Sequence, residues 1–177
     1  MTVDGFVCGP NGELDWMTQG WTDDVKKYVM DLTDTCDTIL LGKNMTDGFV
    51  TYWESLLDKP EDEGYLFAQK MTGYPKVVFS KTLTESKWNN TIVEKSIEII
   101  DDLKKEDGKD IIVYGGATFV SSLVKANLID EYYLVINPVA IGNGRRIFGE
   151  IDHKFNLSLV DSISFDTGKV LNKYIPN

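Results

Sequence analysis

Apolar side chains along this chain follow two patterns, helical spacing and short unbroken runs. Helical spacing is found in the segments 22–35, 61–72, 96–108 and the residues that follow 117. Short apolar runs of the kind found in buried strands occupy 38–41, 76–79 and 111–114. Because each run follows a helical segment, the pattern predicts an α/β fold: a mostly parallel central sheet with helices on both faces.

The last third of the chain follows a different pattern. Residues 131–138 predict a strand with no helix after it, 155–159 alternate strictly between apolar and polar, and 169–174 follow a turn at 166–168. The last two segments predict an antiparallel hairpin at one side of the sheet. Because the length suffices for one well-buried core and is short for two, we expect a single domain over 1–177.

Ligands of open α/β sheets bind outside the carboxyl ends of the strands, so the residues after each strand are candidates for a binding site. Segment 111–119 contains a strand, a double glycine and the start of a helix in direct succession. Glycine allows close backbone approach to a ligand, and a helix N-terminus attracts an anion. The other strand ends carry Gly42, Lys43, Ser80 and Lys81. We therefore expect a pyrophosphate at this edge, with a simple tight turn as the alternative for the double glycine.

The composition limits the classes of partner. A formal net charge of −10 argues against nucleic acid or an anionic membrane, although a small anionic cofactor is compatible with local clusters of lysine. No apolar stretch approaches the roughly 20 residues of a membrane span, and no signal segment opens the chain, so we expect a cytoplasmic protein. Cys8, Cys36 and the single histidine, His153, match no metal-binding spacing, so no metal site is expected.

The chain has only two arginines, Arg145 and Arg146, and they are adjacent within the glycine-containing loop 141–148. The planar guanidinium group suits phosphate or carboxylate, which makes this pair a candidate anion contact. A solvated loop end, or a packing contact with an acidic neighbour, is the alternative.

Six stretches in fixed order together resemble a known family. They are 2–16, 37–43, 78–83, 113–117, 128–132 and 142–148. Their order is similar to that of the dihydrofolate-reductase-like family, and more closely to its branch related to the reductase domain of bacterial riboflavin-biosynthesis enzymes. The resemblance spans nearly the whole chain. It implies NADPH across the carboxyl edge of the sheet and reduction of a small heterocycle, pteridine-like or pyrimidine-like, related to the riboflavin pathway.

The resemblance also implies roles for individual residues. The implied cofactor contacts are Val7, Gly42, Lys43, Ser80, Lys81, Tyr114, Gly115, Gly116, Ala117 and Thr118. Lys43 and Lys81 would lie near the 2′-phosphate, and the double glycine would cradle the pyrophosphate. Asp4 and Trp16 would face the substrate. Asp4 and Asp15 are the candidate proton donors, although an aspartate before a glycine, as at Asp4, is also a common turn former.

Aromatic residues suggest two further expectations. Trp53 is a candidate for stacking on a flat substrate, and packing in the core or at a dimer contact is the alternative. Members of the resembled family commonly pair, and the aromatic-rich segment 132–134 would be exposed on an isolated edge. We therefore expect a homodimer that acts on a small molecule.

The chain departs from the resembled family in three places. The family's Gly-Arg-Lys-Thr is replaced at 42–45 by Gly-Lys-Asn-Met, which exchanges a forked cation for a point charge and moves the hydroxyl to Thr46. The position of the folate-binding carboxylate falls near Lys26, so dihydrofolate is a poor expected substrate. Most of the family's first strand is absent before Met1, so the domain is expected to begin truncated. A non-catalytic nucleotide-binding or interaction protein of the same fold is the alternative function.

Overall fold

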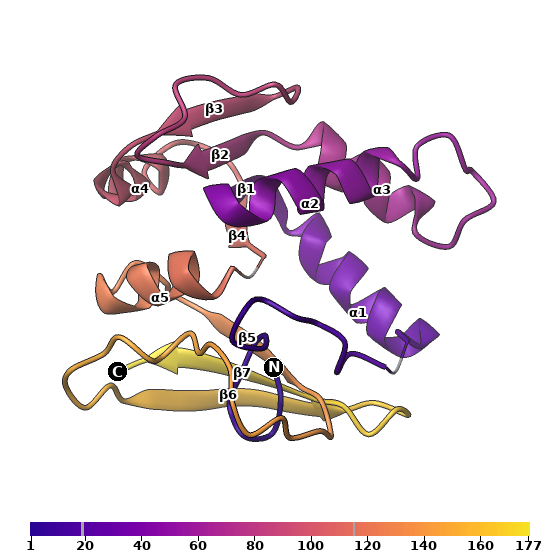
Figure 1. Cartoon of the computed structure of the whole chain (residues 1–177), viewed down its shortest axis with the longest axis vertical. Coiled ribbons are helices and arrows are strands. Elements are labelled where there is room, and N and C mark those ends of the chain that lie inside the picture. Colours follow the sequence, from indigo (N-terminus) through magenta and orange to yellow (C-terminus); the bar gives the residue numbers. More distant parts are fainter. Residues whose placement is uncertain (19, 115) are drawn as a thin grey trace. The chain divides into compact units, whose positions relative to one another are not determined.

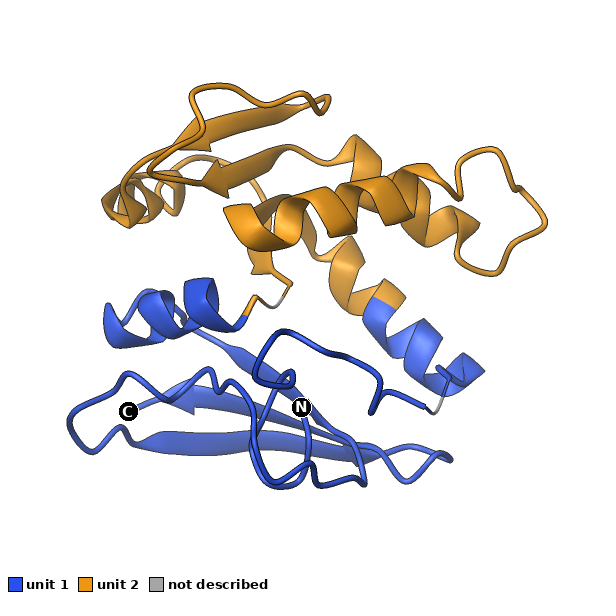
Figure 2. Cartoon of the chain, in the orientation of Figure 1, with its two compact units in different colours: residues 1–29, 117–177 blue, residues 30–116 orange. Residues whose placement is uncertain are grey.

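The computed structural model describes residues 1–18, 20–114 and 116–177 (Figure 1). The chain forms two compact units (Figure 2). Unit 1 comprises residues 1–29 and 117–177, and unit 2 comprises residues 30–116. The chain crosses from unit 1 to unit 2 within the first helix, α1 (Asp23–Asp34), after Val29. It returns to unit 1 at the first residue of α5 (Ala117–Lys125). Each unit has its own sheet, and the two are described separately.

Unit 2 is built on a four-stranded parallel sheet with the strand order β3-β2-β1-β4, which confirms the mostly parallel sheet predicted from the sequence. The strands are β1 (Cys36–Gly42), β2 (Lys76–Phe79), β3 (Thr91–Glu94) and β4 (Asp110–Val113). Gly42 pairs with Phe79, and Phe79 pairs with Glu94, so these strands end at the same edge of the sheet. Every residue of β2 is buried, which the apolar run at 77–79 predicts for an interior strand, and the burial includes the charged Lys76 at its start.

The helices of unit 2 supply the apolar layer on its sheet. They are α2 (Lys43–Glu54), α3 (Tyr65–Gly73), the 3-10 helix η1 (Ile97–Ile99) and α4 (Ile100–Leu103). α2 packs on β1 and β2, and α3 packs on α2 (Figure 1). The core between these elements contains Ile39, Leu41, Val50, Met71 and Val78. Burial of these side chains fixes the position of α2, whose first residue follows β1 directly.

Unit 1 is built on a three-stranded antiparallel sheet with the strand order β5-β7-β6. The strands are β5 (Tyr132–Ile136), β6 (Leu157–Ser164) and β7 (Val170–Pro176). The predicted hairpin is confirmed as β6 and β7, but its predicted place at one side of the parallel sheet is wrong, because it pairs with β5 in a separate sheet. The start of the chain joins this unit through a parallel bridge between Thr2 and Asn137.

The helices differ from the sequence prediction in two respects. α2 was not predicted, and the segment 96–108 contains only the short η1 and α4 instead of one continuous helix. None of the helices in the described part of the chain is long and apolar enough to cross a membrane.

Candidate functional site

The carboxyl edge of the parallel sheet contains a helix start without a side-chain cap. β1 passes directly into α2 at Gly42 and Lys43. Gly42 is the N-cap residue, its backbone is extended (φ −80°, ψ 143°), and no side chain bonds the first N–H groups of α2. Such N–H groups and the positive end of the helix dipole attract an anion. The two residues predicted here as cofactor contacts therefore lie where an anion would be stabilised.

Lys43 and the turn after β2 are joined by a hydrogen bond. The Nζ of Lys43 donates to the Oγ1 of Thr82 at 2.6 Å, and both residues are exposed. Ser80 is buried, and its hydroxyl oxygen accepts from the backbone N–H groups of Thr82 and Leu83 at 3.2 and 2.9 Å. Ser80 therefore shapes the turn that carries the exposed Lys81, and its own contact with a cofactor stays a prediction.

The end of β4 reaches the same helix start. Gly116 has a φ of +79°, a left-handed conformation that favours glycine, and a Cβ added to it would lie 3.6 Å from the Sδ of Met45. Met45 belongs to the first turn of α2. Gly115, the other half of the predicted double-glycine site, lies outside the described residues. The ends of β1, β2 and β4 thus converge on the first turn of α2, all within unit 2.

Tyr114 contributes its side chain to the core of unit 2. Its hydroxyl shares a 2.6 Å hydrogen bond with the Oγ1 of Thr33, and its ring stacks on Phe49 with the centroids 6.0 Å apart. Burial raises the pKa of Tyr114 to about 12. A cofactor could therefore contact only the backbone of Tyr114, so the predicted cofactor contact is limited to its backbone atoms.

Trp53 lies at the opposite end of α2 from Lys43, about 15 Å away at the usual helical rise. Its indole packs against Phe49 and Phe67, with the ring centroids 6.2 and 5.0 Å apart. This aromatic packing explains Trp53 without a ligand and agrees with the core alternative. Its role in substrate binding stays a prediction.

Ala117 and Thr118 are the first residues of α5 and belong to unit 1. Ala117 is buried, and the carbonyl of Thr118 accepts from the Ser122 hydroxyl at 3.0 Å. α5 thus fixes the positions of Ala117 and Thr118, and their contact with a cofactor stays a prediction.

Asp4 anchors a loop of unit 1. Its Oδ2 accepts hydrogen bonds from the backbone N–H groups of Ile141 and Gly142 at 3.1 and 2.8 Å. The Thr2 hydroxyl and the N–H of Gly142 hold the pKa of Asp4 below its ordinary value. Asp4 is therefore ionised at neutral pH and is a poor proton donor, which weighs against the catalytic role predicted for it.

The arginine pair has a structural explanation. The N–H of Val7 donates to the carbonyl of Arg145 at 2.9 Å, and the Nε of Arg145 donates to the carbonyl of Pro10 at 2.9 Å. The Cζ of Arg146 lies 4.4 Å from the centroid of the Phe6 ring, which is a cation–π contact. The two arginines therefore hold the N-terminal segment of unit 1 in place, which agrees with the packing alternative. Their direct partners are carbonyls and a ring, and Arg145 also interacts electrostatically with the acidic Glu13.

Gly144 lets this segment approach the loop closely. A Cβ at Gly144 would lie 2.2 Å from the carbonyl oxygen of Cys8, which accepts the backbone N–H of Arg145. We expect Gly144→Ala to lower the free energy of unfolding in urea by about 1–3 kcal/mol, the usual cost of overpacking. Gly149→Ala is the matched control, because its added Cβ would make only ordinary contacts at 3.7 Å. Equal stability of the two variants would contradict the close approach.

Trp16 supplies a buried donor in unit 1. Its indole Nε1 has no hydrogen-bond partner among the described residues. A buried donor without a partner costs about 1–3 kcal/mol, so a substrate carbonyl or a water would stabilise it. Asp15, the neighbouring candidate for proton transfer, is exposed. The roles of both residues stay predictions.

The described residues contain no group of three or more histidine, cysteine, aspartate or glutamate side chains that could hold a metal ion. Cys8 and Cys36 are free thiols, and the Nδ1 of His153 bonds the Oδ1 of Asp152 at 2.9 Å. The candidate site consists of the first turn of α2, Lys43 and Gly116, at the carboxyl edge of unit 2.

The fold matches proteins of known structure over the whole chain. A candidate riboflavin biosynthesis protein from Shewanella sp. PV-4 superposes with a TM-score of 0.73 at 22% identity, and the match covers 100% of this chain and 95% of that one. The dihydrofolate reductase of Enterococcus faecalis, solved with NADP(H) and RAB-propyl, superposes with a TM-score of 0.61 at 17% identity and covers 100% of this chain and 92% of that one. The chain therefore has a dihydrofolate-reductase-like fold.

The sequence places the chain within this class. The family model of the RibD C-terminal domain matches residues 1–171. The uncharacterised protein YyaP of Bacillus subtilis strain 168 is 34% identical over 174 residues, which cover 96% of this chain and 88% of YyaP. This chain belongs to the RibD C-terminal domain family. The resemblance inferred from the ordered motifs is thereby confirmed.

Proposed function

We propose that this protein is an NADPH-dependent reductase of a small, flat heterocycle related to the riboflavin pathway. The observation that carries the proposal is the convergence of three strand ends on the uncapped first turn of α2. Membership of the RibD C-terminal domain family, together with the shared fold of a dihydrofolate reductase solved with NADP(H), supports this cofactor and this class of reaction.

The groups at this edge suit a dinucleotide phosphate. The first N–H groups of α2 would hold phosphate oxygens, and Gly116 would leave its backbone open to close approach. Lys43 and Lys81 would contact the 2′-phosphate and offset, locally, the net charge of −10. Thr46 would take no part, because its buried hydroxyl donates to the carbonyl of Gly42 at 3.0 Å.

NADPH, when bound, supplies a hydride to the substrate. The protein then has to hold the reactants in a productive orientation and exclude water. Because hydrogen bonds keep Asp4 ionised, we propose that the proton comes from water or from the exposed Asp15. The indole N–H of Trp16 would donate to a substrate carbonyl.

Replacement of Lys81 tests the 2′-phosphate assignment. The loss of a charge-assisted hydrogen bond costs about 1.5–3 kcal/mol, so Lys81→Ala should weaken NADPH binding by about 10- to 100-fold. NADH affinity should change little, because NADH has no 2′-phosphate. Lys59→Ala removes another exposed lysine of unit 2 and serves as the control, with dissociation constants measured by tryptophan fluorescence. Equal losses for NADPH and NADH would remove Lys81 from the site.

A second candidate function is nucleotide binding without catalysis. The observation in its favour is that the Oδ2 of Asp4 is committed to backbone hydrogen bonds, and that hydrogen bonding keeps this carboxyl ionised, while Asp15 is exposed. Both candidates bind NADPH, so substrate-dependent NADPH oxidation distinguishes them. Turnover of any pyrimidine-like or pteridine-like compound would exclude the second.

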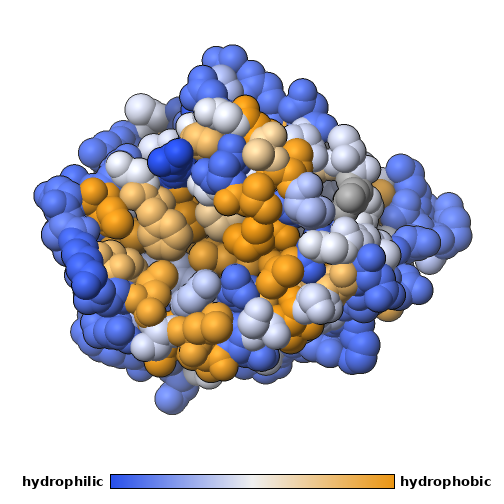
Figure 3. Space-filling view, turned by 90° about the horizontal axis from the view of Figure 1, so that it is seen from below, coloured by the Kyte–Doolittle hydropathy of each residue, from blue (hydrophilic) through white to orange (hydrophobic). Residues whose placement is uncertain are grey.

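We also propose that the protein forms a homodimer through unit 1. The strand register places these side chains on one face of its sheet: Leu134, Ile136, Leu159, Val170 and Tyr174. Leu159 is 57% exposed, and hydrophobic surface gathers on the side of unit 1 seen in Figure 3. A second copy would remove this surface from water.

Sedimentation at micromolar concentration tests the proposed homodimer. It should give twice the 20.0 kDa of one chain, and Leu159→Asp should shift the measured mass toward that of one chain. A single-chain species throughout would contradict the proposal.

A further inference from the structure

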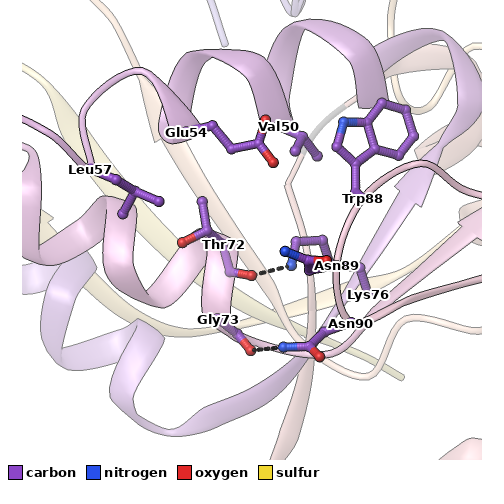
Figure 4. A pocket seen from close by; sticks show the side chains of 9 residues that line it. All are labelled: Val50, Glu54, Leu57, Thr72, Gly73, Lys76, Trp88, Asn89 and Asn90. Carbon is purple, nitrogen blue, oxygen red and sulfur yellow. Dashed lines mark hydrogen bonds between the residues drawn. The ribbon is translucent and has the colours of Figure 1, made fainter.

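A pocket of about 250 Å³ opens in unit 2, away from the proposed cofactor edge (Figure 4). Lys76 lines this pocket and is the first residue of β2, whereas the proposed cofactor edge follows the last residue of that strand, Phe79. The C-terminal half of α2 and the end of α3 form other walls. The pocket therefore lies at the amino ends of the strands, and none of the proposed cofactor contacts lines it.

The pocket contains a buried lysine held in one position. Lys76 is 2% exposed, and its Nζ donates to the carbonyls of Thr72 and Tyr74 at 2.8 and 2.7 Å. These two bonds cap the end of α3 and fix the ammonium group. An ammonium group has three N–H donors, so these two bonds leave one. Burial lowers the pKa of Lys76, the nearby Glu54 carboxylate acts in the opposite direction, and a ligand carbonyl in the pocket would stabilise the charged form further.

The other walls combine an aromatic ring with polar side chains. Trp88 is half-buried against the core of unit 2, and the buried Val50 also lines the pocket. Glu54 adds a carboxylate and Asn89 an amide, and both residues are exposed. Figure 4 shows these side chains arranged around one space with Lys76. The pocket thus offers a fixed donor, an acceptor and a ring face together.

We propose that this pocket binds a small, neutral, planar heterocycle of nucleobase size that carries a ring carbonyl and a ring N–H. The ring carbonyl accepts from Lys76 and from the side-chain amide of Asn89. The N–H donates to Glu54, and the ring lies against Trp88. A charged ligand is disfavoured, because the pocket presents one cation and one carboxylate and would leave one of them facing a like charge. The volume of about 250 Å³ is below the range of about 300–1,000 Å³ typical for larger ligands and suits one ring or two fused rings.

Uracil is the probe, and 1,3-dimethyluracil is its control because both ring N–H groups are methylated. In ¹H–¹⁵N NMR spectra of the full chain, uracil should shift the indole N–H signal of Trp88 and the side-chain amide signals of Asn89. A dissociation constant of about 1 mM or tighter is expected for so small a ligand. Dimethyluracil should bind at least about tenfold more weakly. Shifts confined to the amides of Lys43 and Gly116 would place uracil at the other edge and overturn the proposal.

Two variants remove the polar walls and keep the bonds of Lys76 to α3. Glu54→Gln and Asn89→Ala should each weaken uracil binding by about tenfold. Glu106→Gln, at an exposed glutamate outside the pocket, should leave it unchanged. Uracil affinity that is the same in all three variants would overturn the proposal. A protein that binds uracil at Trp88 but fails to bind NADPH would refute the proposed reductase function and leave this pocket standing.

Discussion

Gly116→Val is expected to weaken NADPH binding by at least about 100-fold while the protein stays folded. A branched side chain at this position would occupy the space through which a pyrophosphate approaches the backbone, beside the first turn of α2. The variant would lose the close approach and the charge-assisted hydrogen bonds that depend on it, each of which contributes about 1.5–3 kcal/mol. Isothermal titration with NADPH measures the loss.

Backbone strain at Gly116 needs its own control, because a β-branched residue is disfavoured at a φ of +79°. Gly168→Val introduces comparable strain at a φ of +75°, in the turn between β6 and β7, and Gly168 is not among the predicted cofactor contacts. This control should lose similar thermal stability and keep its NADPH affinity. Undiminished affinity in a folded Gly116→Val protein would rule out a pyrophosphate at this turn.

The interior strands of the parallel sheet were predictable, because burial on both faces leaves an unbroken apolar run. The segment 76–79 matches β2 residue for residue, and the run at 38–41 falls within β1. The run at 111–114 lies within one residue of β4, which is an edge strand but is also apolar. β3 was missed because, unlike β4, this four-residue edge strand has only two consecutive apolar residues, Ile92 and Val93. An edge strand pairs on one side only and needs no such run.

α2 could not be predicted from local periodicity. Its 12 residues include Gly48 together with β-branched and aromatic residues, all of modest helix propensity. The packing of Val50 with Ile39 and Val78 stabilises the helix instead. These partners come from separate strands, so the helix, and with it the position of Lys43, depends on tertiary contacts that a local pattern does not contain.

The candidate site was predictable in outline, because parallel topology brings the strand ends to one edge. Lys43 and Gly116 both lie at the first turn of α2 for this reason. Side-chain roles were harder to predict, because they depend on individual hydrogen-bond and packing partners that the pattern of apolar residues does not specify. Tyr114 turns into the core to meet a helix, Ser80 bonds its own turn, and Thr82, which was not among the predicted contacts, holds Lys43.

Dihydrofolate is expected to be a very poor substrate, turned over well below about 1 per second. The position that carries the folate-binding carboxylate in the resembled reductases falls near Lys26 of α1, and Lys26 pairs with Asp23 at 3.7 Å. Asp24 is also engaged: its Oδ2 accepts from the N–H of Asp166 at 3.2 Å, and the Thr22 hydroxyl is the main cause of its lowered pKa. Neither aspartate is thus placed as the missing acid.

The comparison of two substrates tests this expectation. NADPH oxidation is measured with dihydrofolate and with a phosphoribosylaminopyrimidine at equal enzyme concentration, and oxidation without substrate is subtracted. Reduction of dihydrofolate requires a carboxylate that pairs with the ring amino group and supports protonation beside the hydride acceptor, whereas Lys26 would repel a protonated pterin. We expect turnover with the pyrimidine alone. Dihydrofolate turnover at about 1 to 10 per second or faster would show that another acid performs this task, and would overturn the proposed substrate class.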